Sequence, residues 1–217
     1  ILNEHANARV KIAKTLDERK LMERPLFYHS AYNESNTEVA LQLNAELWGE
    51  NKINGIKLKD IKTPLGRFSV IELGDDSMAI VDYAHTPDAL VNIGSAIKKA
   101  FPSHFLTVIF GCGGNRDKTK RPLMGKAVQG FADKIIVTSD NPRDEAPEDI
   151  VMDIITGLTK SYEAVIDRKN AIEYALDEMQ EKEIILIAGK GHEEYQEIKG
   201  VKHPFSDFKI VQNYIDG

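Results

Sequence analysis

The chain has 217 residues, of which 42% are hydrophobic and 29% are charged, with one cysteine and a formal net charge of −6. This composition is typical of a globular protein and excludes a collagen-like or disordered chain. A disulfide-stapled chain is also excluded, because a single cysteine cannot form an internal disulfide. The acidic balance argues against a nucleic-acid-binding surface, and apolar runs far shorter than the ~20 residues of a membrane helix predict a cytoplasmic protein without a membrane segment.

The first 66 residues carry weaker signals than the rest of the chain. Val39, Leu43 and Leu47 recur at helical spacing, which predicts a helix over residues 36–48. We therefore expect a partial, mainly helical segment over residues 1–66.

From Arg67 onward, predicted strands and helices alternate. The helices carry apolar stripes, and the strands read as short apolar runs without polar alternation, as expected for strands covered on both faces. This order predicts a doubly wound, mostly parallel, Rossmann-like α/β sheet over residues 67–217. The predicted strands are 67–73, 77–81, 104–110, 134–138, 164–166 and 183–188, and the predicted helices begin at Pro87, after the loop 111–121, at Pro147 and at Lys169.

Most of the unusual polar residues follow four of these strands. The carboxyl ends of parallel strands meet at one edge of a sheet, and ligands of open α/β sheets bind outside that edge. We therefore expect four loops to share one rim. They are DYAHTPD at 82–88, GCGGNRDKTKRP at 111–122, SDNPR at 139–143 and GKGHEEY at 189–195.

The SDNPR loop combines a carboxylate and a guanidinium beside a rigid proline. Asp140 can accept from an ammonium group, and Arg143 can bind a carboxylate through two hydrogen bonds, which together hold a zwitterionic amino acid. Glu193 offers a second acceptor, and Gly189 allows close backbone approach. The alternative is a simple turn, since Asp, Asn and Pro are common turn formers, but a turn leaves Arg143 unexplained.

The glycine-rich loop at 111–114 can form a tight turn or, with the basic residues between 116 and 121, an anion site. Neither G-x-G-x-x-G nor G-x-x-x-x-G-K-[ST] occurs in the chain, so we predict no phosphate loop. His85 and His192 have no further histidine or cysteine nearby, and we predict no metal site. Cys112 lacks a nucleophile–base pattern, and we interpret it as a packing residue.

Four motifs occur in a fixed order: VDYAHTPDAL, FGCGGNRDKTKRPLMG, TSDNPR and AGKGHEEYQ. Together they closely resemble the C-terminal domain of the Mur ligases, in particular the type that adds the third amino acid of the peptidoglycan peptide. The resemblance covers residues 33–217. It implies that residues 1–66 are the end of the family's central ATPase domain and that residues 67–217 are the amino-acid-binding domain.

The resemblance also implies a reaction. Such ligases use ATP and Mg²⁺ to add an amino acid to UDP-N-acetylmuramoyl-L-alanyl-D-glutamate, through an acyl phosphate that the incoming amine attacks. The family's phosphate loop, Mg²⁺ ligands and modified lysine would lie upstream of this sequence. We therefore expect a C-terminal piece of a monomeric ligase that acts on small molecules. Alone, this piece would be inactive, with no catalytic residue and no metal or nucleotide held by its own residues.

By motif, the resemblance assigns an amino-acid site to residues of three loops. Two arginines would hold carboxylates, and two acidic residues would receive an ammonium group. The DNPR tetrad is the form that the family uses for meso-diaminopimelate, whose distal end carries a carboxylate as well as an amine. meso-Lanthionine has the same two ends. The assigned residues are Arg116, Asp140, Asn141, Pro142, Arg143, Gly189 and Glu193.

Arg67, Asp82 and His85 resemble family positions near the nucleotide at the domain hinge. Three alternatives remain. A lysine-adding Mur ligase shares the family, and cyanophycin and folylpolyglutamate synthetases share the architecture, although they are not expected to show DNPR together with GKGHE. A stand-alone, non-catalytic amino-acid-binding module is the third.

Overall fold

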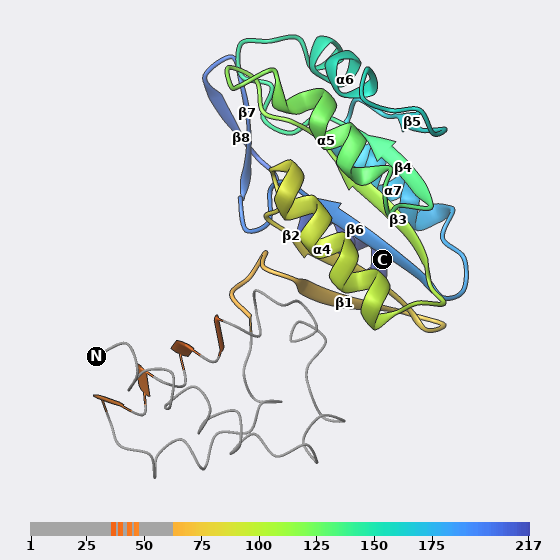
Figure 1. Ribbon diagram of the computed structural model, residues 1–217. Helices are drawn as coiled ribbons and strands as arrows, with labels where there is room; N and C mark the ends of the chain where they lie inside the picture. Colours follow the sequence, from red (N-terminus) through yellow and green to blue (C-terminus); the bar gives the residue numbers. More distant parts are fainter. Residues whose placement is uncertain (1–35, 38, 41–42, 45, 48–62) are drawn as a thin grey trace. The chain divides into compact units, whose positions relative to one another are not determined.

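The computed structural model describes residues 36–37, 39–40, 43–44, 46–47 and 63–217. The chain divides into two compact units, Ile1–Lys62 and Thr63–Gly217. In the first unit, the described positions between 36 and 47 are helical (Figure 1), in agreement with the apolar spacing. The rest of the helix predicted over residues 36–48 lies outside the described residues. That the first unit ends an ATPase domain stays a prediction.

The second unit contains a six-stranded sheet in the order β1-β2-β6-β3-β4-β5 (Figure 1). β1 runs antiparallel to β2, and every other neighbouring pair in this sheet is parallel. The predicted mostly parallel sheet is therefore confirmed, with strand bounds within two residues of the predicted ones. The strands are β1 (Ser69–Gly74), β2 (Ser77–Asp82), β3 (Phe105–Phe110), β4 (Lys134–Val137), β5 (Glu163–Ala164) and β6 (Glu183–Ala188).

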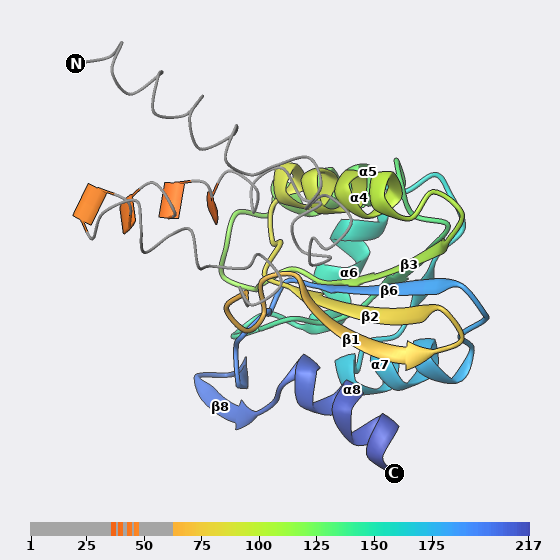
Figure 2. The same cartoon turned by 90° about the horizontal axis from the view of Figure 1, so that it is seen from below.

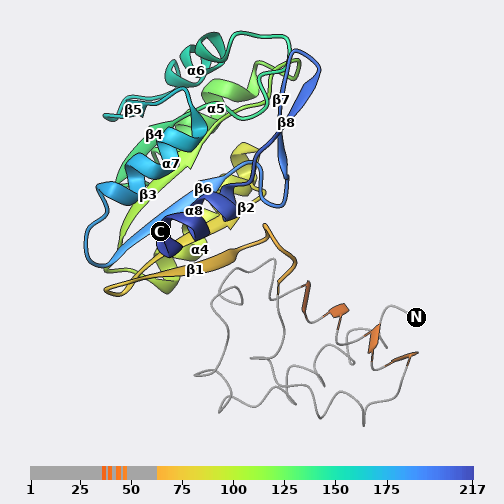
Figure 3. The same cartoon turned by 180° about the vertical axis from the view of Figure 1, so that it is seen from behind.

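Helices cover both faces of this sheet (Figure 2). On one face α4 packs against α5, and α5 packs against α6; on the other face α7 packs against α8, as the view from behind shows (Figure 3). The connection from β5 through α7 returns the chain to the middle of the sheet, so the sheet is doubly wound. The helices are α4 (Pro87–Ala100), α5 (Lys120–Val128), α6 (Pro147–Ile155), α7 (Arg168–Asp177) and α8 (Asp207–Asp216).

Burial follows from these layers. Every residue of β2 and β6 is buried, because both strands lie inside the sheet with helices on each face. Leu90, Ile93 and Ile97 of α4 are fully buried, as their predicted stripe requires. The Thr86 hydroxyl caps α4 by accepting from Ala89 N at 3.2 Å, and Pro87 takes the first turn, as predicted.

The sequence patterns did not predict the elements that follow β6. β7 (Tyr195–Ile198) and β8 (Val201–Pro204) form a separate antiparallel hairpin, which precedes α8. The hairpin is joined to the SDNPR loop by main-chain bonds: Arg143 N donates to Glu197 O at 3.0 Å, and Lys199 N donates to Arg143 O at 2.8 Å. Among the helices that the structure describes, none is long and apolar enough to cross a membrane.

Candidate functional site

The four predicted loops do share one rim, at the carboxyl ends of β2, β3, β4 and β6. Gly114 N donates to Asn141 O at 2.8 Å, which joins the glycine-rich loop to the SDNPR loop. Lys190 Nζ donates to Asn141 Oδ1 at 2.9 Å, which joins SDNPR to GKGHEEY. The rings of Tyr83 and His192 lie 5.4 Å apart and connect the first loop to the last. The topology rule therefore located this rim correctly.

Glycine is required in the glycine-rich loop by the neighbouring backbone. A Cβ atom on Gly114 would overlap Pro142 O, and one on Gly111 would overlap Thr138 O. These positions accept only a residue without a side chain, because the two loops touch main chain to main chain. The glycine-rich loop thus packs directly against the SDNPR loop.

Lys190 lies fully buried at the centre of the rim. Its Nζ donates to Asn141 Oδ1 at 2.9 Å and to Tyr195 O at 2.8 Å, and it lies 3.2 Å from Asp140 Oδ1 and 3.4 Å from Glu193 Oε2. The two residues expected to receive a ligand ammonium therefore already face an ammonium group of the chain itself. The sequence prediction missed Lys190, because lysine is rarely buried and its spacing carries no signal of burial.

The side-chain amide of Asn141 is oriented by its neighbours. Its Oδ1 accepts from Lys190 Nζ and from Glu197 N, both at 2.9 Å, so its Nδ2 faces and donates to Glu193 Oε2 at 2.9 Å. Asp140 differs, because its Oδ1 lies 3.2 Å from Lys190 Nζ in an ion pair without a hydrogen bond. Among the described residues, no donor makes a hydrogen bond to this buried oxygen.

Arg143 is held by both its backbone and its side chain. Its backbone is left-handed, with φ of 52°, a conformation that bonds to the β7–β8 hairpin maintain. The Nη1 atom donates to Gly114 O at 2.9 Å, and Nε lies 3.2 Å from Glu197 Oε2. No residue that the structure describes accepts from Nη2, which leaves one side of the guanidinium fork available to a carboxylate.

The remaining predicted residues flank this network. Arg116 is exposed on the glycine-rich loop, and Pro142 is buried within SDNPR. Gly189 has a φ of 116°, which a residue with a side chain adopts only with strain. The structure thus joins Asp140, Asn141, Arg143 and Glu193 in one network, with the other three at its edges; the role of each in ligand binding stays a prediction.

The three residues expected near a nucleotide gather around Tyr83. The Arg67 guanidinium lies 4.7 Å from the centre of the Tyr83 ring, and the centre of the His85 ring lies 4.7 Å from that same point. Asp82 is buried and accepts two backbone N–H groups, from Phe68 and Ala84, at 2.8 Å each. Asp82 therefore fixes the entry into β1, while Arg67 and His85 are exposed beside it.

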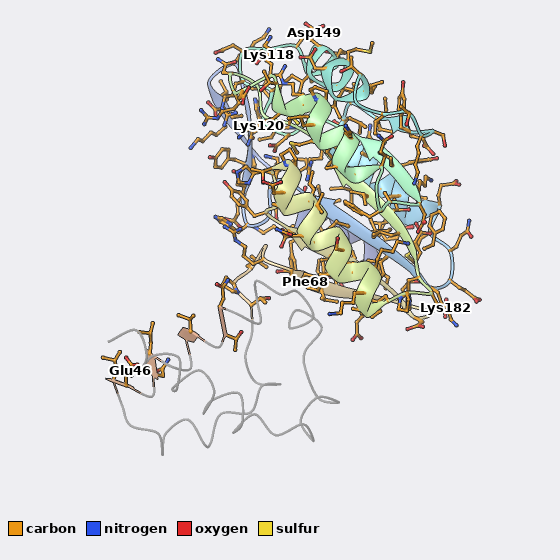
Figure 4. All side chains as sticks on the ribbon, viewed as in Figure 1. Glu46, Phe68, Lys118, Lys120, Asp149 and Lys182 are labelled. Atoms are coloured by element: carbon orange, nitrogen blue, oxygen red, sulfur yellow. The ribbon has the colours of Figure 1, made fainter. Side chains whose placement is uncertain are left out.

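Among the basic residues between 116 and 121, Arg121 is paired within the protein, which corrects its part in the anion site considered for this loop; an anion site at Arg116, Lys118 and Lys120 stays a prediction. Arg121 is buried and binds both oxygens of Glu145, at 3.0 and 2.8 Å, and Asp153 at 2.8 Å. Lys118 Nζ lies 3.0 Å from Glu145 Oε2, and Lys118 and Lys120 lie at the surface (Figure 4). Arg121 therefore ties α5 to α6 and is not available to a ligand.

Cys112 is a packing residue, as interpreted from the sequence. Its Sγ lies 3.4 Å from Met124 Sδ in the interior, and burial raises the pKa of its thiol to about 12. The thiol is protonated at neutral pH and cannot serve as a nucleophile. Among the described residues, no group of three or more His, Cys, Asp or Glu side chains is arranged to hold a metal ion.

The Arg121–Glu145 contact predicts a pH dependence of stability. Hydrogen bonds from Arg121, Asn115 and Lys118 lower the pKa of Glu145 from 4.5 to about 2. Because the pKa is lower in the folded state, ionised Glu145 stabilises the fold above about pH 4.5, and this contribution is lost as the pH falls toward about 2. In urea denaturation at neutral pH and at about pH 3, the wild type should lose more unfolding free energy than Glu145→Gln. Equal losses in the two proteins would contradict the expected coupling.

The fold and the rim together define a class: a Rossmann-like α/β domain whose strand-end loops carry a network of carboxylates, a buried lysine and an arginine. Comparison with known families identifies which domain of this class it is. Residues 66–191 match the family model described as Mur ligase, glutamate ligase domain, and the chain belongs to this family.

Curated relatives agree with this family. The chain is 49% identical over 162 residues to the UDP-N-acetylmuramoyl-L-alanyl-D-glutamate--2,6-diaminopimelate ligase of Aquifex aeolicus, which covers 74% of this chain and 33% of that protein. It is 47% identical over 164 residues to the ligase of the same name from Phocaeicola vulgatus, covering 73% and 34% of the two chains. The chain thus spans about a third of the length of these relatives.

Solved structures give the same result. A structure of a UDP-N-acetylmuramoyl-L-alanyl-D-glutamate--2,6-diaminopimelate ligase matches with a TM-score of 0.69 at 42% identity, covering 86% of this chain and 39% of that one. A folylpolyglutamate synthase from Thermotoga maritima matches with a TM-score of 0.53 at 27% identity, covering 71% and 34%. Both similarities agree with the doubly wound sheet described above.

Proposed function

We propose that this chain is the amino-acid-binding part of an ATP-dependent ligase that adds meso-diaminopimelate to UDP-N-acetylmuramoyl-L-alanyl-D-glutamate in peptidoglycan precursor synthesis. The observation that carries the proposal is the rim, where the SDNPR loop presents a carboxylate and a half-free guanidinium beside Glu193. The identity of 49% to a diaminopimelate ligase, against 27% to a folylpolyglutamate synthase, favours this substrate over the synthetase alternative.

Each charged group of the ligand has a counterpart on the rim. The free side of the Arg143 fork would bind the distal carboxylate, and Asp140 and Glu193 would receive the distal ammonium. Arg116, exposed on the neighbouring loop, would bind the second carboxylate. Gly189 would let the ligand approach the main chain, since no Cβ atom covers it.

The chain's part in the reaction would be to hold and present the amine. In this reaction class, ATP and Mg²⁺ activate the glutamate carboxylate as an acyl phosphate, and the remaining amine of diaminopimelate attacks it as phosphate leaves. By orienting the amine, the rim would hold it close to the acyl phosphate, and this lowers the entropic cost of a step between two molecules. Since the described residues include no set of metal ligands, we assign no step to a metal held by this chain.

The exposed cluster around Tyr83 would face the nucleotide. Arg67 and His85 are exposed beside the Tyr83 ring, where a guanidinium and an imidazole can contact phosphate or ribose oxygens. Asp82 would contribute indirectly, because its carboxylate bonds to backbone N–H groups and holds this segment in place.

Substrate preference tests the proposal. L-Lysine lacks the distal carboxylate, so Arg143 would lose its ligand partner, whereas meso-lanthionine keeps both distal groups. We expect a full-length ligase carrying this chain to use meso-diaminopimelate with a kcat/KM at least about 100-fold higher than that for L-lysine, and to accept meso-lanthionine. The measurement is ligation of each amino acid to the UDP-linked dipeptide, followed by phosphate release. A preference for L-lysine would refute the proposal.

A further inference from the structure

The proposed ligand site on the rim contains both cations and carboxylates. Among the charged side chains on the loops after β3, β4 and β6 and on the adjoining β7, six belong to the proposed ligand site or pair with its residues. They are Arg116, Arg143 and Lys190 with Asp140, Glu193 and Glu197. Only one of the cations, Lys190, is fully buried.

Lys190 cannot touch a ligand, because its ammonium is enclosed by groups of the protein. It contacts one oxygen of each expected ammonium acceptor, Oδ1 of Asp140 and Oε2 of Glu193. Among the described residues, no donor binds the second oxygen of either side chain. Lys190 can therefore act on a ligand by positioning Asp140, Asn141 and Glu193 and by its own charge.

We propose that Lys190 is a positioning and specificity-determining residue for the amino acid. By holding one oxygen of Asp140 and one of Glu193, it leaves the other oxygen of each for the ligand ammonium. Its positive charge offsets the carboxylates beside it, and this favours a ligand of zero net charge over one of net charge +1. The inference rests on the proposed function and adds a source of selectivity that is separate from Arg143.

If Lys190 had only a structural role, its loss would affect the binding of the two amino acids differently from the proposal. meso-Diaminopimelate has zero net charge at neutral pH, and L-lysine has a net charge of +1, although both carry the distal ammonium. Loss of rim structure would weaken both ligands by the same factor. Loss of one positive charge from the rim would leave one carboxylate without a compensating cation. L-Lysine, with its net charge of +1, would be attracted to this carboxylate, so binding of meso-diaminopimelate would weaken relative to binding of L-lysine.

The experiment is a titration of the 217-residue chain with meso-diaminopimelate and with L-lysine, each followed by chemical-shift changes in NMR spectra. Lys190→Gln keeps a hydrogen-bond donor and removes the charge. We expect it to reduce the ratio of the L-lysine Kd to the meso-diaminopimelate Kd by about tenfold. The matched control is Lys209→Gln, which removes a charge from an exposed pair with Glu194 and should leave the ratio unchanged.

A second variant tests the charge balance even if Lys190→Gln does not fold. Glu197→Gln removes a half-buried carboxylate beside Arg143 and should raise the same ratio by about tenfold. An unchanged ratio in folded Lys190→Gln would overturn the inference, as would an unchanged or lower ratio in Glu197→Gln. If the wild type binds neither amino acid, the proposed function fails and the inference fails with it. If it binds meso-diaminopimelate but the ratios do not move, only the inference fails.

Discussion

Replacing Arg143 with alanine should weaken binding of meso-diaminopimelate by about 100-fold while leaving the chain folded. The free side of the guanidinium is the group on this rim placed to bind the distal carboxylate, and a charge-assisted contact of this kind contributes roughly 1.5–3 kcal/mol. Within the fold, the Arg143 side chain contacts mainly Gly114 O and Glu197, so its removal should lower the unfolding free energy by only about 1 kcal/mol.

Two comparisons make the Arg143 measurement specific. Arg143→Lys keeps the charge but lacks the planar fork, and we expect an intermediate loss of affinity. Binding of L-lysine should not weaken in Arg143→Ala, because L-lysine has no distal carboxylate. Calorimetric titration gives the affinities, and circular dichroism reports the fold. An unchanged affinity for meso-diaminopimelate would mean that Arg143 serves only the turn and its hairpin contact.

Replacing Arg168 with methionine should lower the unfolding free energy by about 3–5 kcal/mol. Arg168 and Asp207 are both fully buried, and the guanidinium binds the two carboxylate oxygens at 2.8 Å each. The same guanidinium donates to Ala188 O at 2.9 Å and to Ser139 O at 3.4 Å, at the ends of β6 and β4. Methionine would leave the Asp207 charge buried without a partner.

The double variant Arg168→Met/Asp207→Leu distinguishes the energy of the ion pair from that of the other contacts of the two residues. Removing both charges should recover most of the lost stability, because no unpaired charge then remains inside the protein. Urea denaturation of the wild type, both single variants and the double variant completes the cycle. A loss below about 1 kcal/mol in Arg168→Met would show that the buried pair does not anchor α8 to the sheet.

The fold was predictable where the signal is local. β2, β6 and α4 follow from short apolar runs and from a Thr-Pro start, which depend only on neighbouring residues. The β7–β8 hairpin was missed because its strands bury little: every residue of β8 is exposed. Its position depends on main-chain bonds to Arg143, which no hydrophobic period reveals.

The candidate site was likewise predictable from the sequence only in part. The loops of the rim could be placed from topology, since parallel strands end at one edge. The buried cations could not, because their partners are distant in sequence: 49 positions separate Lys190 from Asn141, and 39 separate Arg168 from Asp207. Arg121 shows the same limit, since the sequence suggested a tight turn or an anion site there, while its partner Glu145 lies 24 positions away.

A crystal structure of this chain with meso-diaminopimelate would test the central claim most directly. We predict that one ligand carboxylate lies within hydrogen-bond distance of the Arg143 guanidinium, with the neighbouring ammonium between Asp140 and Glu193. Lys190 should keep its contact with Asn141 in that structure. A ligand bound away from the SDNPR and GKGHEEY loops, or bound there with its distal carboxylate turned away from Arg143, would contradict the claim.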